Sequence, residues 1–127
     1  LLHNNNQKFI CKNVHLKPVS NSAAISKGLD HSKAYSVPIA HGEGRYYASE
    51  ETISKLQNND QVLFKYCDGS GTVSDSINPN GSLMNIAGVT NEKKNVFGMM
   101  PHPERSSDPI LQTKDGAMLF ESLLKHC

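Results

Sequence analysis

The chain has 127 residues, which is enough for one modest domain with a buried core. Thirteen Lys and Arg residues nearly balance twelve Asp and Glu residues, so no basic field points to a nucleic-acid partner. No apolar run approaches the length of a membrane span, and three widely spaced cysteines without a CxxC pair are typical of reduced thiols. We therefore expect a cytoplasmic globular protein with neither a nucleic-acid nor a membrane partner.

The first half of the chain predicts two strands and a helix. Residues 8–16 are rich in β-branched and aromatic side chains and precede Pro18, which is typical of a strand. Residues 37–40 predict a second, shorter strand that runs into the glycine-punctuated turn "HGEGR". Residues 48–60 predict a helix, because Ser49 suits the N-cap position and two glutamates follow it in the positive first turn.

The second half predicts three strands and a final helix. Residues 61–67 form a continuous apolar run, and residues 85–91 and 95–100 are strand-like runs joined by the charged turn "EKK". Residues 115–127 predict the clearest helix. Its expected apolar stripe consists of Ala117, Phe120, Leu123 and Leu124. Short strands that alternate with helices indicate an α/β domain in which helices pack on a sheet.

In the segment "FGMMPHPERSS", a histidine lies between Pro101 and Pro103, and a glutamate follows Pro103. Proline fixes its own φ and disfavours the helical region for the residue before it, so this segment is expected to be extended. Side chains two apart in an extended chain share a face, which brings His102 and Glu104 together. A carboxylate beside an imidazole fixes its tautomer and stabilises its charged form, so the pair could be two members of a catalytic triad.

No residue of the chain is a convincing nucleophile for such a triad. A catalytic Ser or Cys usually lies on a sharp strand-to-helix turn with small neighbours. Cys11 lies inside a predicted strand, no predicted helix follows Cys67, and Cys127 is terminal. The candidate serines lie in turns, where serine is common for local hydrogen bonding. From the residues alone, His102 and Glu104 could equally be a catalytic pair or part of a rigid surface loop.

Three motifs in this order, "HGEGR", "NPNGS" and "GMMPHPER", resemble the class I glutamine amidotransferases, and the resemblance extends over nearly the whole chain. Within that family it is strongest to glutaminase subunits that supply ammonia for de novo purine synthesis. The resemblance implies an α/β, flavodoxin-like three-layer fold. It also implies that residues 1–127 are the C-terminal part of one amidotransferase domain.

The resemblance implies a chemistry as well. In the family, a cysteine thiolate attacks the side-chain amide of glutamine, ammonia leaves, and water releases glutamate. His102 matches the catalytic base and Glu104 the residue that orients it. The ammonia passes to a synthetase subunit that uses ATP and Mg, so the implied partners are that synthetase and a small accessory subunit. The glutaminase subunit itself is expected to need no cofactor and no metal.

The family's nucleophile lies in a G-x-C-x-G turn that precedes the segment similar to "LLHNNN". It would therefore lie upstream of Leu1, and residues 1–127 alone are expected to be inactive. Cys11 and Cys67 match non-catalytic strand positions of the family. This leaves His102 and Glu104 as the catalytic residues that the chain itself supplies.

Two further motifs have both a functional and a structural interpretation. By resemblance, His41 and Gly42 of "HGEGR" lie against bound glutamine; the alternative is a tight turn with a solvated Glu43 and a solvated Arg45. The "NPNGS" run could line the mouth of the site or contact the synthetase, or it could be only a turn.

Three other function classes remain open at this point. A metal-dependent hydrolase could use His102, Glu104 and His41, although the sequence shows no usual ligand spacing. A non-catalytic, amidotransferase-like scaffold could dock onto a synthetase. The chain could also belong to the glutaminase domain of a different class I amidotransferase.

Overall fold

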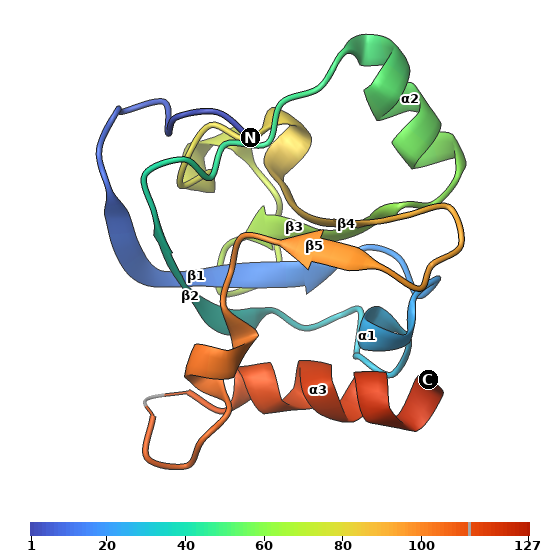
Figure 1. The fold of residues 1–127 in the computed structure, drawn as a ribbon. Coiled ribbons are helices and arrows are strands. Elements are labelled where there is room, and N and C mark those ends of the chain that lie inside the picture. Colours follow the sequence, from blue (N-terminus) through green and yellow to red (C-terminus); the bar gives the residue numbers. More distant parts are fainter. Residues whose placement is uncertain (112) are drawn as a thin grey trace.

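The computed structural model describes residues 1–111 and 113–127. These residues form five strands and three α-helices, which Figure 1 labels. The strands are β1 (Ile10–Pro18), β2 (Tyr35–His41), β3 (Val62–Cys67), β4 (Ile86–Thr90) and β5 (Phe97–Met99). The helices are α1 (Ala24–Lys27), α2 (Glu50–Asn58) and α3 (Asp115–His126). None of the helices in these two ranges is long and apolar enough to cross a membrane.

The strands form one sheet in the order β2-β1-β3-β4-β5, and every neighbouring pair is antiparallel. On the β1–β2 pair, Val14 lies opposite Val37, so two apolar side chains meet on the same face. The alternation of strands and helices predicted the strands themselves but not their direction. Antiparallel pairing is a property of the connections, which no local pattern encodes.

The helices cover the sheet from two sides, as the three-layer expectation requires. Figure 1 shows α1 and α3 together below the sheet and α2 above it. The larger apolar cluster joins α1 and α3 to strands β1 to β4, with Ile25, Leu16 and Leu119 among its fully buried members. A smaller cluster joins α2 to β3 and β4 through Ile53, Val62 and Ile86. The expected α/β class is confirmed, with two cores on opposite faces of one sheet.

Helix α2 begins as predicted. The Oγ of Ser49 accepts a hydrogen bond from the backbone N–H of Thr52 at 3.3 Å, and Glu50 and Glu51 occupy the first turn. An N-cap of this kind satisfies a backbone donor that the helix itself leaves unpaired.

The predicted apolar stripe of α3 is only partly buried, since Leu123 packs against the larger apolar cluster and Leu124 does not. Leu124 is 81 % exposed, whereas the buried residues are Gly116, Leu119 and Ser122. Ser122 is small enough to let α3 approach α1 closely. Its Oγ donates to Ala24 O at 2.7 Å and accepts from the N–H of Gly28 at 2.8 Å. Ser122 therefore faces α1, whereas Gly116 lies against Pro103.

Candidate active site

His102 and Glu104 are paired, with 2.8 Å between His102 Nδ1 and Glu104 Oε1. The backbone reason differs from the prediction, because Glu104 lies in a short 3₁₀ helix, Pro103–Ser106, and not in an extended chain. A carboxylate only accepts, so His102 Nδ1 carries the proton and Nε2 is the nitrogen available for proton transfer. The two side chains are 32 % and 56 % exposed, which leaves the pair open to a substrate.

The 3₁₀ helix is fixed between the outer edge of β2 and the start of α3. The backbone N–H of His102 donates to Pro38 O at 2.8 Å, and Ser106 Oγ donates to Ser36 O at 3.2 Å. On the other side, a Cβ at Gly116 would lie 2.0 Å from Pro103 O, so only glycine permits this approach. The catalytic candidates thus stand on a turn that two elements hold in place.

His41 ends β2 and is buried, with 6 % of its surface exposed. Its Nδ1 lies 2.9 Å from Asn4 Oδ1, and no group in the described residues hydrogen-bonds its buried Nε2. The pKa of His41 is lowered because burial disfavours the charged ring, and the positive charge of His102 acts in the same direction. The structure therefore brings the two predicted histidines into one electrostatic environment.

The "HGEGR" and "NPNGS" motifs form one unit. Asn80 is fully buried, and its Nδ2 donates to Gly44 O at 2.8 Å. From the other side, the N–H of Gly44 donates to Asn4 Oδ1 at 3.2 Å. The "NPNGS" run thus braces the "HGEGR" turn. Of the residues expected to be solvated there, Glu43 is exposed beside His3, whereas Arg45 Nε donates to Gly81 O at 3.1 Å.

Asn4 is the residue that sequence reasoning missed, and the contact of Asn80 with the "HGEGR" turn was not predicted either. Asparagine is common in turns, and nothing in "LLHNNN" distinguishes the buried Asn4 from its exposed neighbours Asn5 and Asn6. Gly42, the second predicted binding residue, is partly exposed, and its carbonyl accepts from the N–H of Asn4 at 2.9 Å. Both predicted residues of this turn therefore depend on Asn4 for their position.

The cysteines do not join this site. Cys67 is buried at the end of β3, opposite His15 of β1. Burial and the negative charge of Asp68 raise the pKa of its thiol to about 11, so the thiol is protonated at neutral pH. Cys11 and Cys127 are exposed.

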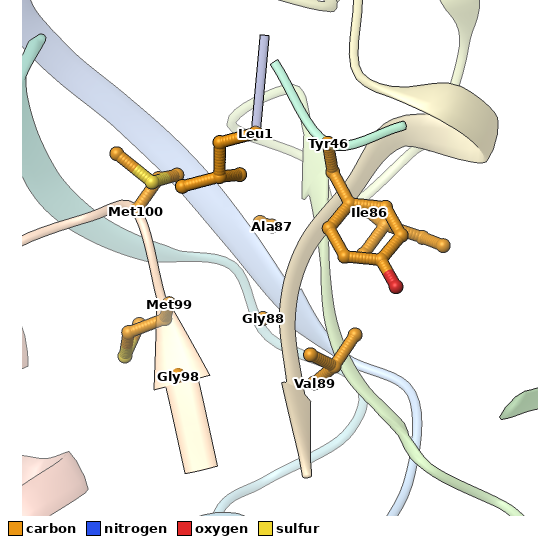
Figure 2. Close-up of a pocket in the computed structure, with 9 residues that line it drawn as sticks. All are labelled: Leu1, Tyr46, Ile86, Ala87, Gly88, Val89, Gly98, Met99 and Met100. Carbon is orange, nitrogen blue, oxygen red and sulfur yellow. The ribbon is translucent and has the colours of Figure 1, made fainter. Parts of the chain in front are cut away.

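An apolar cavity of about 300 Å³ borders the segment that carries the pair. Figure 2 shows Gly88 and Val89 of β4, and Gly98 and Met99 of β5, on its two sides. Met100, two residues before His102, also lines the cavity.

The described residues contain no group of three His, Cys, Asp or Glu side chains placed to hold a metal ion. His41, His102 and Glu104 therefore do not make the three-ligand set that the hydrolase alternative requires.

Residues 1–118 match the family model of the CobB/CobQ-like glutamine amidotransferase domain, and the chain belongs to this family. The motifs "HGEGR", "NPNGS" and "GMMPHPER" thus all lie within the matched amidotransferase domain. The class I amidotransferase fold expected from the resemblance is confirmed.

Several relatives carry the name phosphoribosylformylglycinamidine synthase subunit PurQ. The protein from Aquifex aeolicus is 51 % identical over 124 residues, which are 98 % of this chain and 55 % of the relative. The one from Methanocaldococcus jannaschii is 43 % identical over 126 residues, 99 % of this chain and 55 % of the relative. A solved structure of PurLQS from Thermotoga maritima matches with a TM-score of 0.78 and 36 % identity, over 98 % of this chain and 51 % of that one. The chain spans about half the length of the relatives it matches.

Proposed function

We propose that the protein hydrolyses glutamine to glutamate and ammonia, as the glutaminase subunit of phosphoribosylformylglycinamidine synthase in purine biosynthesis. Residues 1–127 are then the C-terminal part of one amidotransferase domain. The observation that carries the proposal is the 2.8 Å contact between His102 Nδ1 and Glu104 Oε1 in a chain of the amidotransferase family. An accessible imidazole that a carboxylate holds in one orientation is the arrangement that proton transfer to a substrate requires.

In the proposed mechanism His102 Nε2 takes the proton of a cysteine thiol, and the thiolate attacks the glutamine amide. The same nitrogen then protonates the leaving ammonia, and water releases glutamate from the thioester. Glu104 holds the ring and stabilises its charged form. General acid–base catalysis of this kind contributes about 10²–10⁴ in rate. We place the nucleophile outside residues 1–127, because the Cys67 thiol is protonated and buried.

His41 and Gly42 are proposed to lie against bound glutamine. In support, the pKa of His41 is lowered chiefly by burial and also by the charge of His102. We propose that released ammonia reaches a synthetase subunit that uses ATP and Mg, with a small accessory subunit as a further partner, in the cytoplasm. The similarity to PurLQS supports these partners. The glutaminase subunit itself is proposed to use no cofactor.

His102→Ala in the full-length protein tests the function. Glutamine-dependent synthesis should fall by about 10²–10⁴, the contribution of general acid–base catalysis, while ammonia-dependent synthesis stays intact. Both rates are measured on the same complex, with glutamine or an ammonium salt as the nitrogen source. An equal loss of both rates would show that His102 does not serve ammonia release.

A further inference from the structure

The buried ring of His41 has one nitrogen with a partner and one without. Nδ1 contacts Asn4 Oδ1 at 2.9 Å, whereas within the described part of the chain Nε2 has no hydrogen-bond partner. Buried polar atoms are nearly always satisfied, and the exceptions often have a functional reason. Which nitrogen carries the proton decides what the ring can do.

The contacts of Asn4 settle the tautomer. Its Nδ2 donates to His41 O and to Lys8 O, each at 2.8 Å, so both of its donor positions are used by carbonyls. Its Oδ1 accepts the N–H of Gly44 at 3.2 Å. The amide cannot be turned around without losing all three bonds. Asn4 Oδ1 therefore presents an acceptor to His41, and His41 Nδ1 must be the nitrogen that carries the hydrogen.

A second set of contacts holds the ring in this position. A Cβ at Gly44 would lie 2.3 Å from His41 Nδ1, so the backbone of Gly44 lies directly against the imidazole. Asn80 Nδ2 donates to Gly44 O at 2.8 Å, which fixes that backbone from the side away from Asn4. The ring is thus confined by a peptide unit that two buried asparagines hold.

We propose that Asn4 is a positioning residue of the glutaminase site: it holds His41 as the neutral Nδ1–H tautomer, with Nε2 as a bare acceptor. A proton on Nε2 would be buried without an acceptor, so His41 stays uncharged while His102 takes up and releases a proton. The site then has one proton carrier and one fixed neutral ring. The inference rests on the proposed function for its catalytic consequence, but not for the tautomer.

The tautomer is measured by ¹⁵N-resolved NMR of the His41 ring in the full-length protein. At neutral pH we expect a protonated Nδ1 and a bare Nε2. In Asn4→Leu, which removes the acceptor, the preference for Nδ1–H should disappear. An Nε2–H tautomer in the natural protein would overturn the proposal, and this measurement needs no variant to fold.

Asn4→Asp tests the catalytic consequence. The carboxylate keeps an acceptor for His41 Nδ1 and nearly the same volume, but it loses the two bonds that Nδ2 donates to Lys8 O and His41 O, and its charge favours a doubly protonated His41. The positive charge that His41 then carries opposes the protonation of His102, so kcat with glutamine should fall by about 10–100-fold, the range seen when groups that orient metal-binding histidines are removed. Ammonia-dependent synthesis should be unchanged.

Asn6→Asp is the matched control, because Asn6 is exposed and its Oδ1 only accepts from the N–H of Lys8 at 3.0 Å. It should retain full activity. Full glutamine-dependent activity in Asn4→Asp would overturn the positioning role. The proposed function would fail separately, through an unaffected His102→Ala enzyme, whatever the tautomer of His41.

Discussion

At the scale of single residues, the site contrasts two histidines with the same hydrogen-bond pattern and different partners. Both carry their proton on Nδ1, but His102 donates it to a carboxylate and His41 to an amide. A carboxylate favours the imidazolium that forms when Nε2 takes a second proton, whereas an amide adds no charge to offset one. In the proposed mechanism Glu104 therefore supports His102 as the base, and Asn4 keeps His41 neutral.

Glu104→Gln should reduce glutamine-dependent kcat by less than His102→Ala does. The amide can still hold the ring of His102, but it gives up the charge that stabilises the imidazolium. The two variants are compared by steady-state kinetics with glutamine, and ammonia-dependent synthesis serves as the reference. Equal losses in both variants would contradict the orienting role of Glu104.

The Cys67 thiol should resist alkylation. With a pKa of about 11 it is protonated at pH 8, and it is also buried, whereas Cys11 is exposed. Iodoacetamide at pH 8 should therefore modify Cys11 well before Cys67, as peptide mass spectrometry would show. A glutamine-analogue diazo-ketone should likewise spare all three cysteines in the full-length protein. Its attachment to Cys67 would show that the nucleophile lies in this chain.

At the scale of elements, the sequence predicted where strands and longer helices lie better than it predicted which of their faces are buried. The apolar run at residues 61–67 and the capped helix after Ser49 are local signals, and both elements formed within a residue or two of the prediction. Helix α1 was missed because four residues leave no measurable periodicity. The buried face of α3 was predicted only in part, because hydrophobicity does not register that Gly116 and Ser122 provide room for their neighbours.

The candidate site likewise contains one contact that the sequence predicted and one that it did not. The pairing of His102 with Glu104 could be predicted because the partners are only two positions apart in the chain. The contact of Asn4 with His41 could not, because it joins residues 37 positions apart through hydrogen bonds that have no sequence period.

Gly116→Ala should disturb the turn that carries His102. The new Cβ would lie 2.0 Å from Pro103 O, so α3 and the 3₁₀ helix must separate. Overpacking of this kind typically costs about 1–3 kcal/mol of unfolding free energy. Urea unfolding measures that loss, and glutamine-dependent kcat should fall with it.

The matched control is Gly98→Ala in β5, where an added Cβ meets no atom within 4 Å. It should leave both the unfolding free energy and kcat close to those of the natural protein. If the two substitutions behave alike, the close approach at Gly116 does not hold the site.

At the scale of the whole molecule, three segments that are far apart in the chain meet around one turn. The N–H of Leu2 donates to Arg45 O at 2.9 Å, and the N–H of Asn5 donates to Asn80 O at 3.1 Å. The first residues, the "HGEGR" turn and the "NPNGS" run are thereby tied into one layer beside the sheet. The glutamine side of the proposed site depends on this long-range assembly, whereas the His102 side depends on β2 and α3.

One edge of the sheet is covered and the other is open, and this difference predicts how residues 1–127 behave when they are expressed alone. The β2 edge is covered, since Pro38 O accepts from the N–H of His102 and Ser36 N–H donates to Asp115 Oδ2 at 2.7 Å. In the ranges 1–111 and 113–127, no strand pairs with the outer edge of β5, and Gly98 and Met99 of this strand also line the apolar cavity of Figure 2. An open edge next to apolar surface favours association between chains.

We therefore expect residues 1–127, expressed alone, to self-associate through β5 as the concentration rises. Sedimentation velocity measures this directly. Gly98→Lys should reduce the association, because its side chain enters open space and places a charge at the edge strand and the cavity. Leu124→Lys, which replaces an 81 % exposed leucine on α3, adds the same charge away from β5 and should leave the association unchanged. A monodisperse chain, or equal effects of the two lysines, would show that the β5 edge is not the surface through which the chains associate.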